Sequence, residues 1–200
     1  MTDETSTKKL KALRSFQMKT VADMIEKLDW EIGMLVDMQN SIDLDTARKA
    51  SYCAINAAIS AWHVVDWCWV VASAEQRARW LANAPVHRAK QSPQSQFQRL
   101  LEDNCSALRL CKEVANAAKH LKPGQFTDHQ VQTSGPVFVT VKASAGGLSS
   151  GEPIATHTAW LLIREDGGQQ HTAKSVLDEA NDFLWGFAAD EGLLDLPGGE

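Results

Sequence analysis

Residues 45–73 are predicted to form one long helix, and its composition determines how closely other helices can pack on it. Alanines recur along the segment and form a small-residue face that permits close helix approach: Ala47, Ala50, Ala54, Ala57, Ala58 and Ala61. The stretch AWHVVDWCWV, residues 61–70, places three tryptophans around one histidine and one aspartate. The chain has seven tryptophans and a single tyrosine, and rings of that size fill wide gaps between helices. A packed helical core is therefore expected.

The remaining helices follow from apolar periodicity and from the glycines and prolines at their ends. They are predicted over residues 7–38, 75–83, 95–121 and 173–190. The break NSIDLD offers Ser41, Asp43 and Asp45 as N-caps for the long helix. A polar linker with two prolines covers residues 85–96.

The pattern changes to that of strands after residue 124. The segments PVFVTVKAS and THTAWLLIRED are rich in β-branched and aromatic residues, which favours strands. The turn EDGGQQ lets residues 158–165 pair with 169–172 as a hairpin, and residues 144–153 are predicted as a loop. The predicted fold class is mainly α (α+β), a helical bundle with a small antiparallel β-sheet and a C-terminal helix. Residues 1–124 would form the bundle core, and 125–200 would add the sheet and the closing helix to the same single domain.

Several functional classes are not expected. No apolar run approaches the roughly 20 residues that span a bilayer, and the N-terminus lacks the apolar stretch of a signal peptide, so we expect a cytoplasmic protein without a membrane partner. No two cysteines form a C-x-x-C pair, so neither a zinc knuckle nor a redox motif is indicated. We expect no metal and no cofactor, and we expect reduced, buried thiols at Cys53, Cys68, Cys105 and Cys111.

Charge is spread unevenly along the chain, whose net charge is -5. Residues 76–122 carry nine basic and three acidic side chains, whereas residues 123–200 carry three basic and eleven acidic ones. Two explanations remain open. The basic middle either faces the acidic tail of the same chain or of a partner, or it forms a local patch for the phosphates of RNA or a nucleotide.

A polar stripe follows one face of the long helix, since Tyr52, Asn56, His63 and Asp66 recur at helical spacing. His63 and Asp66 are three residues apart and can touch, and a carboxylate beside an imidazole fixes its tautomer as in an oriented general base. The alternative is that the stripe forms a buried, satisfied hydrogen-bond network that fixes the register of the helix. A His-x-x-Asp pair lacks the further ligands that a metal site needs.

A second polar group lies in ANAAKHLKPG, residues 115–124. Asn116 and His120 are four residues apart on one helix face, with Lys119 beside them. Arg109 and either Lys112 or Glu113 extend this face upstream. It is also the solvent face of the helix, so ordinary exposure explains it equally well. The remaining histidines are expected at the surface: His87, His129, His157 and His171.

The pairing of AWHVVDW on one helix with ANAAKHLKP at the end of a later one resembles a family of bacterial and phage-borne helical proteins with WHxxDW and NxxKH motifs. The second motif is similar to the Asn- and His-bearing helix of the HEPN superfamily (higher eukaryotes and prokaryotes nucleotide-binding). The resemblance covers roughly residues 45–124. Members of the superfamily are small helical bundles, often dimeric. Many are metal-independent ribonucleases of toxin–antitoxin or phage-defence systems, and others bind nucleotides or act as scaffolds.

The resemblance implies a role for each candidate residue. His120 would deprotonate an RNA 2′-hydroxyl or, as its conjugate acid, protonate the leaving oxygen, with Asn116 as its polar neighbour. Ala115 stands where the family usually has an arginine, so Lys119 or Arg109 would stabilise the phosphate charge. His63 and Asp66 would support the site from the facing helix, and the candidate binding residues are Tyr52, Asn56, Arg109 and Lys112. The alternative function is a non-catalytic interaction or scaffold module with a buried His–Asp–Asn network.

Overall fold

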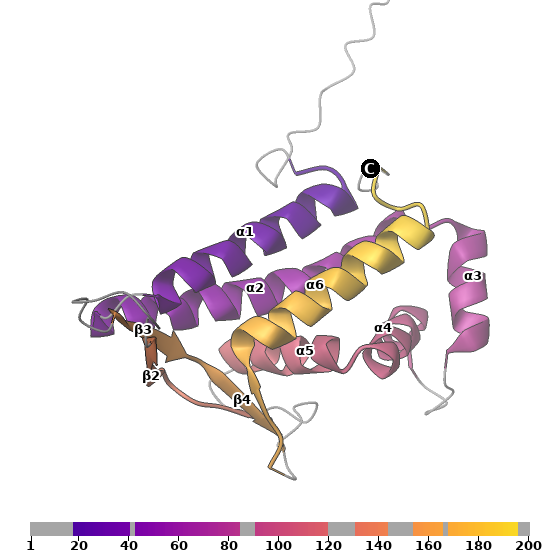
Figure 1. The fold of residues 1–200 in the computed structure, drawn as a ribbon. Coiled ribbons are helices and arrows are strands. Elements are labelled where there is room, and N and C mark those ends of the chain that lie inside the picture. The colour runs from indigo at the N-terminus through magenta and orange to yellow at the C-terminus, as the bar shows by residue number, and fades with distance from the viewer. Residues whose placement is uncertain are drawn as a thin grey trace, which may run out of the picture.

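The computed structural model describes residues 18–40, 43–84, 91–119, 131–143, 154–165 and 168–195. In this part of the chain, four helices pack side by side: α1 (Val21–Gln39), α2 (Leu44–Val71), α5 (Ser106–Lys119) and α6 (Ala173–Asp190) (Figure 1). Two shorter helices, α3 (Ala74–Asn83) and α4 (Pro93–Asn104), lie at one end, and short strands lie at the other. The prediction of a mainly α fold with a helical bundle, a small antiparallel sheet and a C-terminal helix is confirmed.

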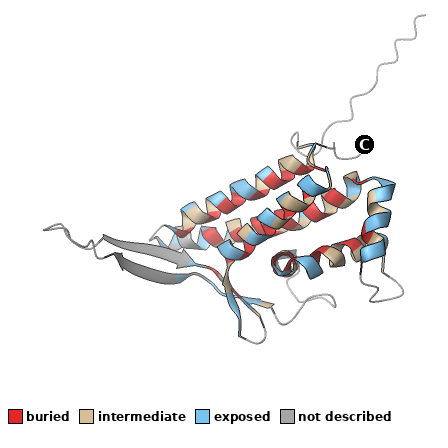
Figure 2. Ribbon diagram, turned by 45° about the vertical axis from the view of Figure 1, so that its right-hand side comes forward, coloured by how far each residue is buried: buried red, intermediate tan, exposed pale blue. Residues whose placement is uncertain are grey.

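Helix α2 is the centre of the bundle, because it packs against α1, α5 and α6. The buried residues of the helices form stripes on the sides that face one another (Figure 2). On α2 the stripe consists mainly of the predicted small residues and of two valines: Ala50, Ala54, Ala57, Ala58, Ala61, Val64 and Val65. By length and composition Arg48–Val71 could cross a membrane, which corrects the expectation that no such run exists. In this fold its small apolar side is covered by other helices.

Local signals in the sequence fix the helix ends. Thr20 and Asp23 form a capping box that starts α1, and the predicted helical residues 7–17 lie outside the described part of the chain. Asp43, one of the three predicted caps, accepts the backbone N–H of Thr46 and starts α2. Helix α6 ends in a Schellman motif in which Gly192 has a φ of +66°.

The predicted helix over residues 95–121 is two helices, because the chain is extended at Cys105 (φ -141°, ψ 104°). The N–H of Cys105 still bonds the carbonyl of Leu101, and its own carbonyl accepts the N–H of Leu108, so the break leaves both groups satisfied. Residues 85–96 are not all linker either. Ser92 caps α4, and Pro93 occupies its first turn, where the backbone N–H that proline lacks would have no partner within the helix. Residues 85–90 lie outside the described part of the chain.

The strands form two small antiparallel sheets rather than one. The first has the order β1 (Val131–Thr133), β4 (Leu162–Glu165), β5 (Gln170–Thr172), and the second pairs β2 (Val137–Ala143) with β3 (Ile154–Trp160). The predicted hairpin is confirmed as the β4–β5 pair. The predicted strand 156–166 is divided at Leu161, whose carbonyl accepts the N–H of Ala173 at the start of α6. The predicted loop 144–153 lies outside the described residues.

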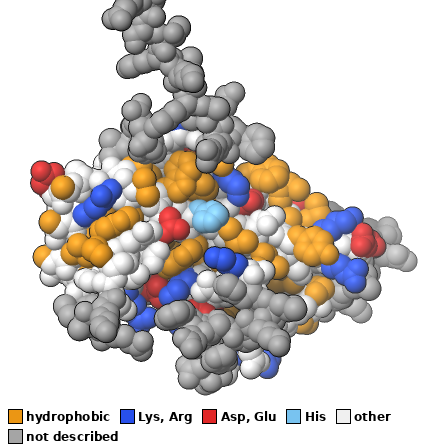
Figure 3. Space-filling model, turned by 180° about the vertical axis from the view of Figure 1, so that it is seen from behind, with side chains coloured by type: hydrophobic (Ala, Val, Ile, Leu, Met, Phe, Trp, Pro, Cys, Tyr) orange, Lys and Arg blue, Asp and Glu red, His pale blue; other side chains and the backbone are white. Residues whose placement is uncertain are grey.

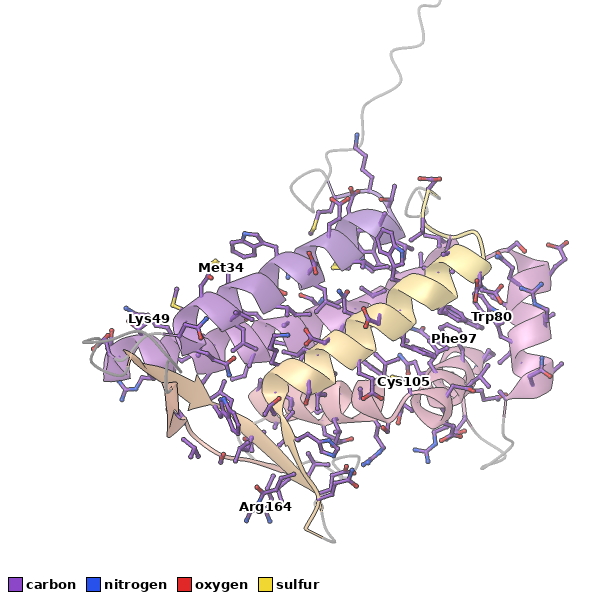
Figure 4. All side chains as sticks on the ribbon, in the orientation of Figure 1. Met34, Lys49, Trp80, Phe97, Cys105 and Arg164 are labelled. Atoms are coloured by element: carbon purple, nitrogen blue, oxygen red, sulfur yellow. The ribbon has the colours of Figure 1, made fainter. Side chains whose placement is uncertain are left out.

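An aromatic cluster holds α3 and α4 to the bundle (Figure 4). The rings of Trp80 and Phe97 stack with centroids 4.6 Å apart, and Trp69 and Phe187 each lie within 6 Å of Phe97. All four cysteines are free; three are buried and Cys53 is half-buried, which confirms the expectation of reduced thiols for the most part. Burial raises the pKa of the Cys68 and Cys111 thiols to about 12.

Candidate functional site

The polar stripe of α2 faces solvent. The side chain of Tyr52 is 58% exposed, Asn56 and His63 are exposed, and Asp66 is half-buried. Tyr52, Asn56 and His63 make no side-chain hydrogen bond within the described residues. The alternative of a buried network on this face is therefore wrong, because α1, α5 and α6 cover the alanine and valine sides of α2 instead.

Asp66 is bonded to α4 rather than to His63. Its Oδ1 accepts hydrogen bonds of 2.9 Å from Nε2 of both Gln94 and Gln98. This carboxylate therefore joins α4 to α2 and does not orient the His63 ring. Neither glutamine was among the predicted site residues, although their spacing of four residues places them on one face of α4.

A second polar contact joins α2, α4 and α5. The Nζ atom of Lys112 lies 5.5 Å from the centroid of the Trp62 ring and donates a 2.8 Å hydrogen bond to Oε1 of Glu102. Glu102 is buried, and Arg99 lies 3.5 Å from its other oxygen. The packing of the helix that carries WHVVDW against the helix that carries NAAK is thus confirmed. This packing also places the ammonium group of Lys112 against Trp62, the residue that precedes His63 in α2.

Arg109 belongs to a different side of the molecule. Its guanidinium bonds the carboxylate of Glu165 in β4, and Nε2 of His171 lies 3.0 Å from the other oxygen of Glu165. The hydrogen bond from Arg109 is the main reason why the pKa of Glu165 is lowered. His171 is half-buried in this pair, not a free surface residue as expected. The side chain of His157 is not described.

The ion pairs clarify the uneven charge along the sequence. Arg109 with Glu165, and Arg79 with Glu191, each join the basic middle to the acidic tail of the same chain. The explanation that these segments neutralise one another is confirmed for these two pairs. Lys119 makes no ion pair within the described residues and is exposed at the end of α5.

The predicted residues fall into two groups along the α2–α5 pair. The two helices run antiparallel (Figure 1). The contact between Lys112 and the Trp62 ring places these two residues opposite each other. Asn116, which is half-buried, lies one turn from Lys112 toward the start of α2, whereas Asp66 lies one turn beyond Trp62 in the other direction. At 1.5 Å per residue the two are about 12 Å apart along the helix axis. On the same scale Asn116 is level with Ala58, between Asn56 and His63, and Lys119 is level with Ile55, between Tyr52 and Asn56.

We call the surface formed by these exposed and half-buried polar residues the α2–α5 face: Tyr52, Asn56, His63, Lys112, Asn116 and Lys119. His120 lies outside the described residues. Seen from behind, where α2 comes forward, the molecule presents hydrophobic side chains mixed with basic and acidic ones around a histidine (Figure 3). An exposed lysine, amides and an aromatic ring are groups that bind phosphates and unstacked bases.

Among the described residues, no group of three or more His, Cys, Asp or Glu side chains is placed to hold a metal ion. No protein-family model matches the sequence, and no curated protein and no solved structure is significantly similar to it. The resemblance to the HEPN superfamily therefore depends on the two sequence motifs alone.

Proposed function

We propose that the protein binds RNA or a nucleotide through the α2–α5 face and cleaves RNA there without a metal ion, as a cytoplasmic HEPN-like protein of a toxin–antitoxin or phage-defence system. The observation that supports this most is the exposure of Tyr52, Asn56 and His63 without hydrogen-bond partners in the described structure. Polar side chains consumed in an internal network would not be available to a ligand. The exposed Lys119 supplies charge that a phosphate backbone attracts, whereas Lys112 is already paired with Glu102.

The proposed reaction is attack of a ribose 2′-hydroxyl on the adjacent phosphorus. The bond from phosphorus to the 5′-oxygen breaks, which leaves a 2′,3′-cyclic phosphate and a 5′-hydroxyl. His120 would take the proton of the 2′-hydroxyl, and a protonated His120 of a second copy would give a proton to the 5′-oxygen. Lys119 is the better candidate for stabilising the phosphorane charge, because the guanidinium of Arg109 is bonded to Glu165.

A ribonuclease assay in the presence of a chelator tests the catalytic part. We expect wild type to cleave unstructured RNA and His120→Ala to lose a factor of about 10²–10⁴ in rate, the usual loss for a general base. Lys174→Ala on α6, outside the α2–α5 face, is expected to retain wild-type activity. Full activity of His120→Ala would show that another residue is the base.

RNA binding tests the non-catalytic part separately. Fluorescence anisotropy with a labelled single strand should show that Lys119→Ala reduces the dependence of log Kd on log salt by roughly 0.7. Lys174→Ala on α6, an exposed lysine away from this face, is the matched control and should change nothing. Absence of binding by wild type at low salt would refute the proposal as a whole.

A specific observation favours the alternative, a helical interaction module. The side chains of Trp30 on α1 and Trp185 on α6 are 65% and 46% exposed. Trp185 lines a groove of about 480 Å³ between the two helices, together with acidic residues such as Asp29 and Asp182. Exposed tryptophans are typical of contact surfaces between proteins. If the chain forms dimers through this groove, Trp185→Ala will convert them to monomers in sedimentation experiments while RNA binding is unchanged.

A further inference from the structure

A cavity of about 410 Å³ lies between α2, α5, α6 and the three-stranded sheet. Its inner wall is formed by buried apolar side chains from all four of these parts: Ala58, Cys111, Leu161, Ile163, Val176 and Leu177. The volume falls in the range of about 300–1,000 Å³ that small-molecule sites have. None of the proposed RNA-binding residues lines it.

The space exists because three helices present alanine at the same place. Ala54 and Ala58 of α2, Ala117 and Ala118 of α5 and Ala173 of α6 all border the cavity. Deeper in the same bundle, leucine and valine fill the corresponding positions, as at Val65 and Leu108, which are fully buried. The cavity is open to solvent on one side, and a ligand that filled it would remove this apolar lining from water.

The rim of the cavity is polar and its interior is not. Ser51, Thr133 and Ser134 border it, and the latter two are exposed. No charged side chain of the described residues lines it, and the Cys111 thiol stays neutral because burial raises its pKa to about 12. An ionised group of a ligand would have no oppositely charged side chain inside the cavity, and burying an unpaired charge in an apolar site costs free energy.

We infer that this cavity binds a neutral, mainly apolar molecule, an alkyl chain or fused aromatic rings, with one hydroxyl or amide group at the Ser51–Thr133 rim. A cavity of about 150 Å³ takes one benzene, so 410 Å³ takes roughly 16 non-hydrogen atoms. Ser51 and Thr133 can each donate and accept one hydrogen bond from such a polar end. This site is distinct from the α2–α5 face and does not depend on the nuclease activity.

The probe for the experiment is N-phenyl-1-naphthylamine, a neutral fluorophore that brightens in apolar surroundings. We expect saturable binding of one probe per chain. Straight-chain 1-alkanols from hexanol to dodecanol should displace it, and each added methylene should tighten the competition by about fourfold until the chain exceeds the cavity. Absence of saturable binding, or displacement that does not depend on chain length, would overturn the inference.

Two filling variants and one control locate the binding. Ala58→Leu places a larger side chain in the cavity and should abolish binding, whereas Ala78→Leu at an exposed position of α3 should bind as wild type does. Ala117→Leu narrows the mouth from an exposed position, so it serves if Ala58→Leu fails to fold by circular dichroism. Wild-type affinity in a folded Ala58→Leu or Ala117→Leu protein would refute the site.

Discussion

The hydroxyl of Ser60 in α2 donates a 2.5 Å hydrogen bond to Oε2 of Glu31 in α1. Lys27 completes the contact, because its Nζ lies 2.5 Å from the Ser60 oxygen and 2.6 Å from Oε1 of Glu31. Ser60 is fully buried and Glu31 is 7% exposed, so the Ser60–Glu31 hydrogen bond is a buried polar contact between the mainly apolar faces of α1 and α2. Both carboxylate oxygens have a donor, and this satisfied arrangement admits one register of α1 on α2.

Removing the carboxylate tests this register contact. In Glu31→Ala the buried Ser60 hydroxyl has no acceptor, and we expect the free energy of unfolding to fall by about 1–3 kcal/mol. Urea denaturation measures it. Glu26→Ala, the same substitution at an exposed position of α1, should change stability by less than about 0.5 kcal/mol. Equal losses in the two variants would mean that the Ser60–Glu31 bond contributes nothing.

The contact of Asp66 with α4 should be modest in strength. Asp66→Ala removes two hydrogen bonds from Gln94 and Gln98, but these half-buried amides can turn to water, so a loss of about 0.5–1.5 kcal/mol is expected. Asp37→Ala on the exposed side of α1 is the control. Hydrogen exchange should quicken in α4 more than in α1. Unchanged exchange in α4 would contradict a docking role for Asp66.

Stability should depend on pH through Glu165. Its pKa in the folded protein is lowered, chiefly by the hydrogen bond from Arg109, relative to about 4.3 for a free glutamate. The stabilisation is therefore complete above the unfolded value and is lost as the pH falls through the lowered pKa. The partial exposure of the pair limits its contribution to about 1 kcal/mol.

Glu165→Gln isolates this effect. Between pH 7 and pH 3, the stability of wild type should fall more steeply than that of the variant, and the two curves should converge at the acidic end. Glu179→Gln at an exposed position of α6 should follow wild type. Parallel curves for wild type and Glu165→Gln would show that the ion pair is not coupled to folding.

Thiol reactivity should report on the burial of the cysteines. Cys68 and Cys111 are buried with pKa values raised to about 12, so neither reacts with iodoacetamide in the folded protein. Cys53 is half-buried and should be alkylated slowly, since burial and the nearby Glu31 raise its pKa. Mass spectrometry should find one modification per native chain and four after denaturation. Rapid labelling of Cys111 under native conditions would contradict the packing of α5.

The sequence was sufficient to predict elements with strong local signals. Helix α6 matches its prediction, and α2 and α3 match theirs to within two residues at each end. The break at Cys105 could not be predicted, because apolar residues keep helical spacing through it and neither glycine nor proline marks it. The division of a strand at Leu161 depends on a hydrogen bond to Ala173, which is a tertiary contact.

The candidate site was predicted less well than the fold. A polar stripe with helical spacing gives the same sequence pattern whether it is buried or exposed, so the exposure of His63 could not be predicted. The partners of Asp66 and Arg109 come from segments 28 and 56 residues away, and no spacing rule connects them. The packing of α2 against α5 was predicted because both helices carry polar stripes, which would need partners if buried. The stripe of α2 is exposed, and the helices pack through their apolar faces instead.

The position of α6 has a consequence for synthesis of the chain. This helix packs against α1, α2 and α5, and the carbonyl of Leu194 accepts the N–H of Ala22 at the start of α1. At about 5–20 residues per second, the ribosome completes α2 roughly 5–20 s before it begins α6. During that interval the apolar side of the α1–α2 hairpin has no permanent cover. We therefore expect the nascent chain to bind chaperones that hold exposed apolar surface during this interval.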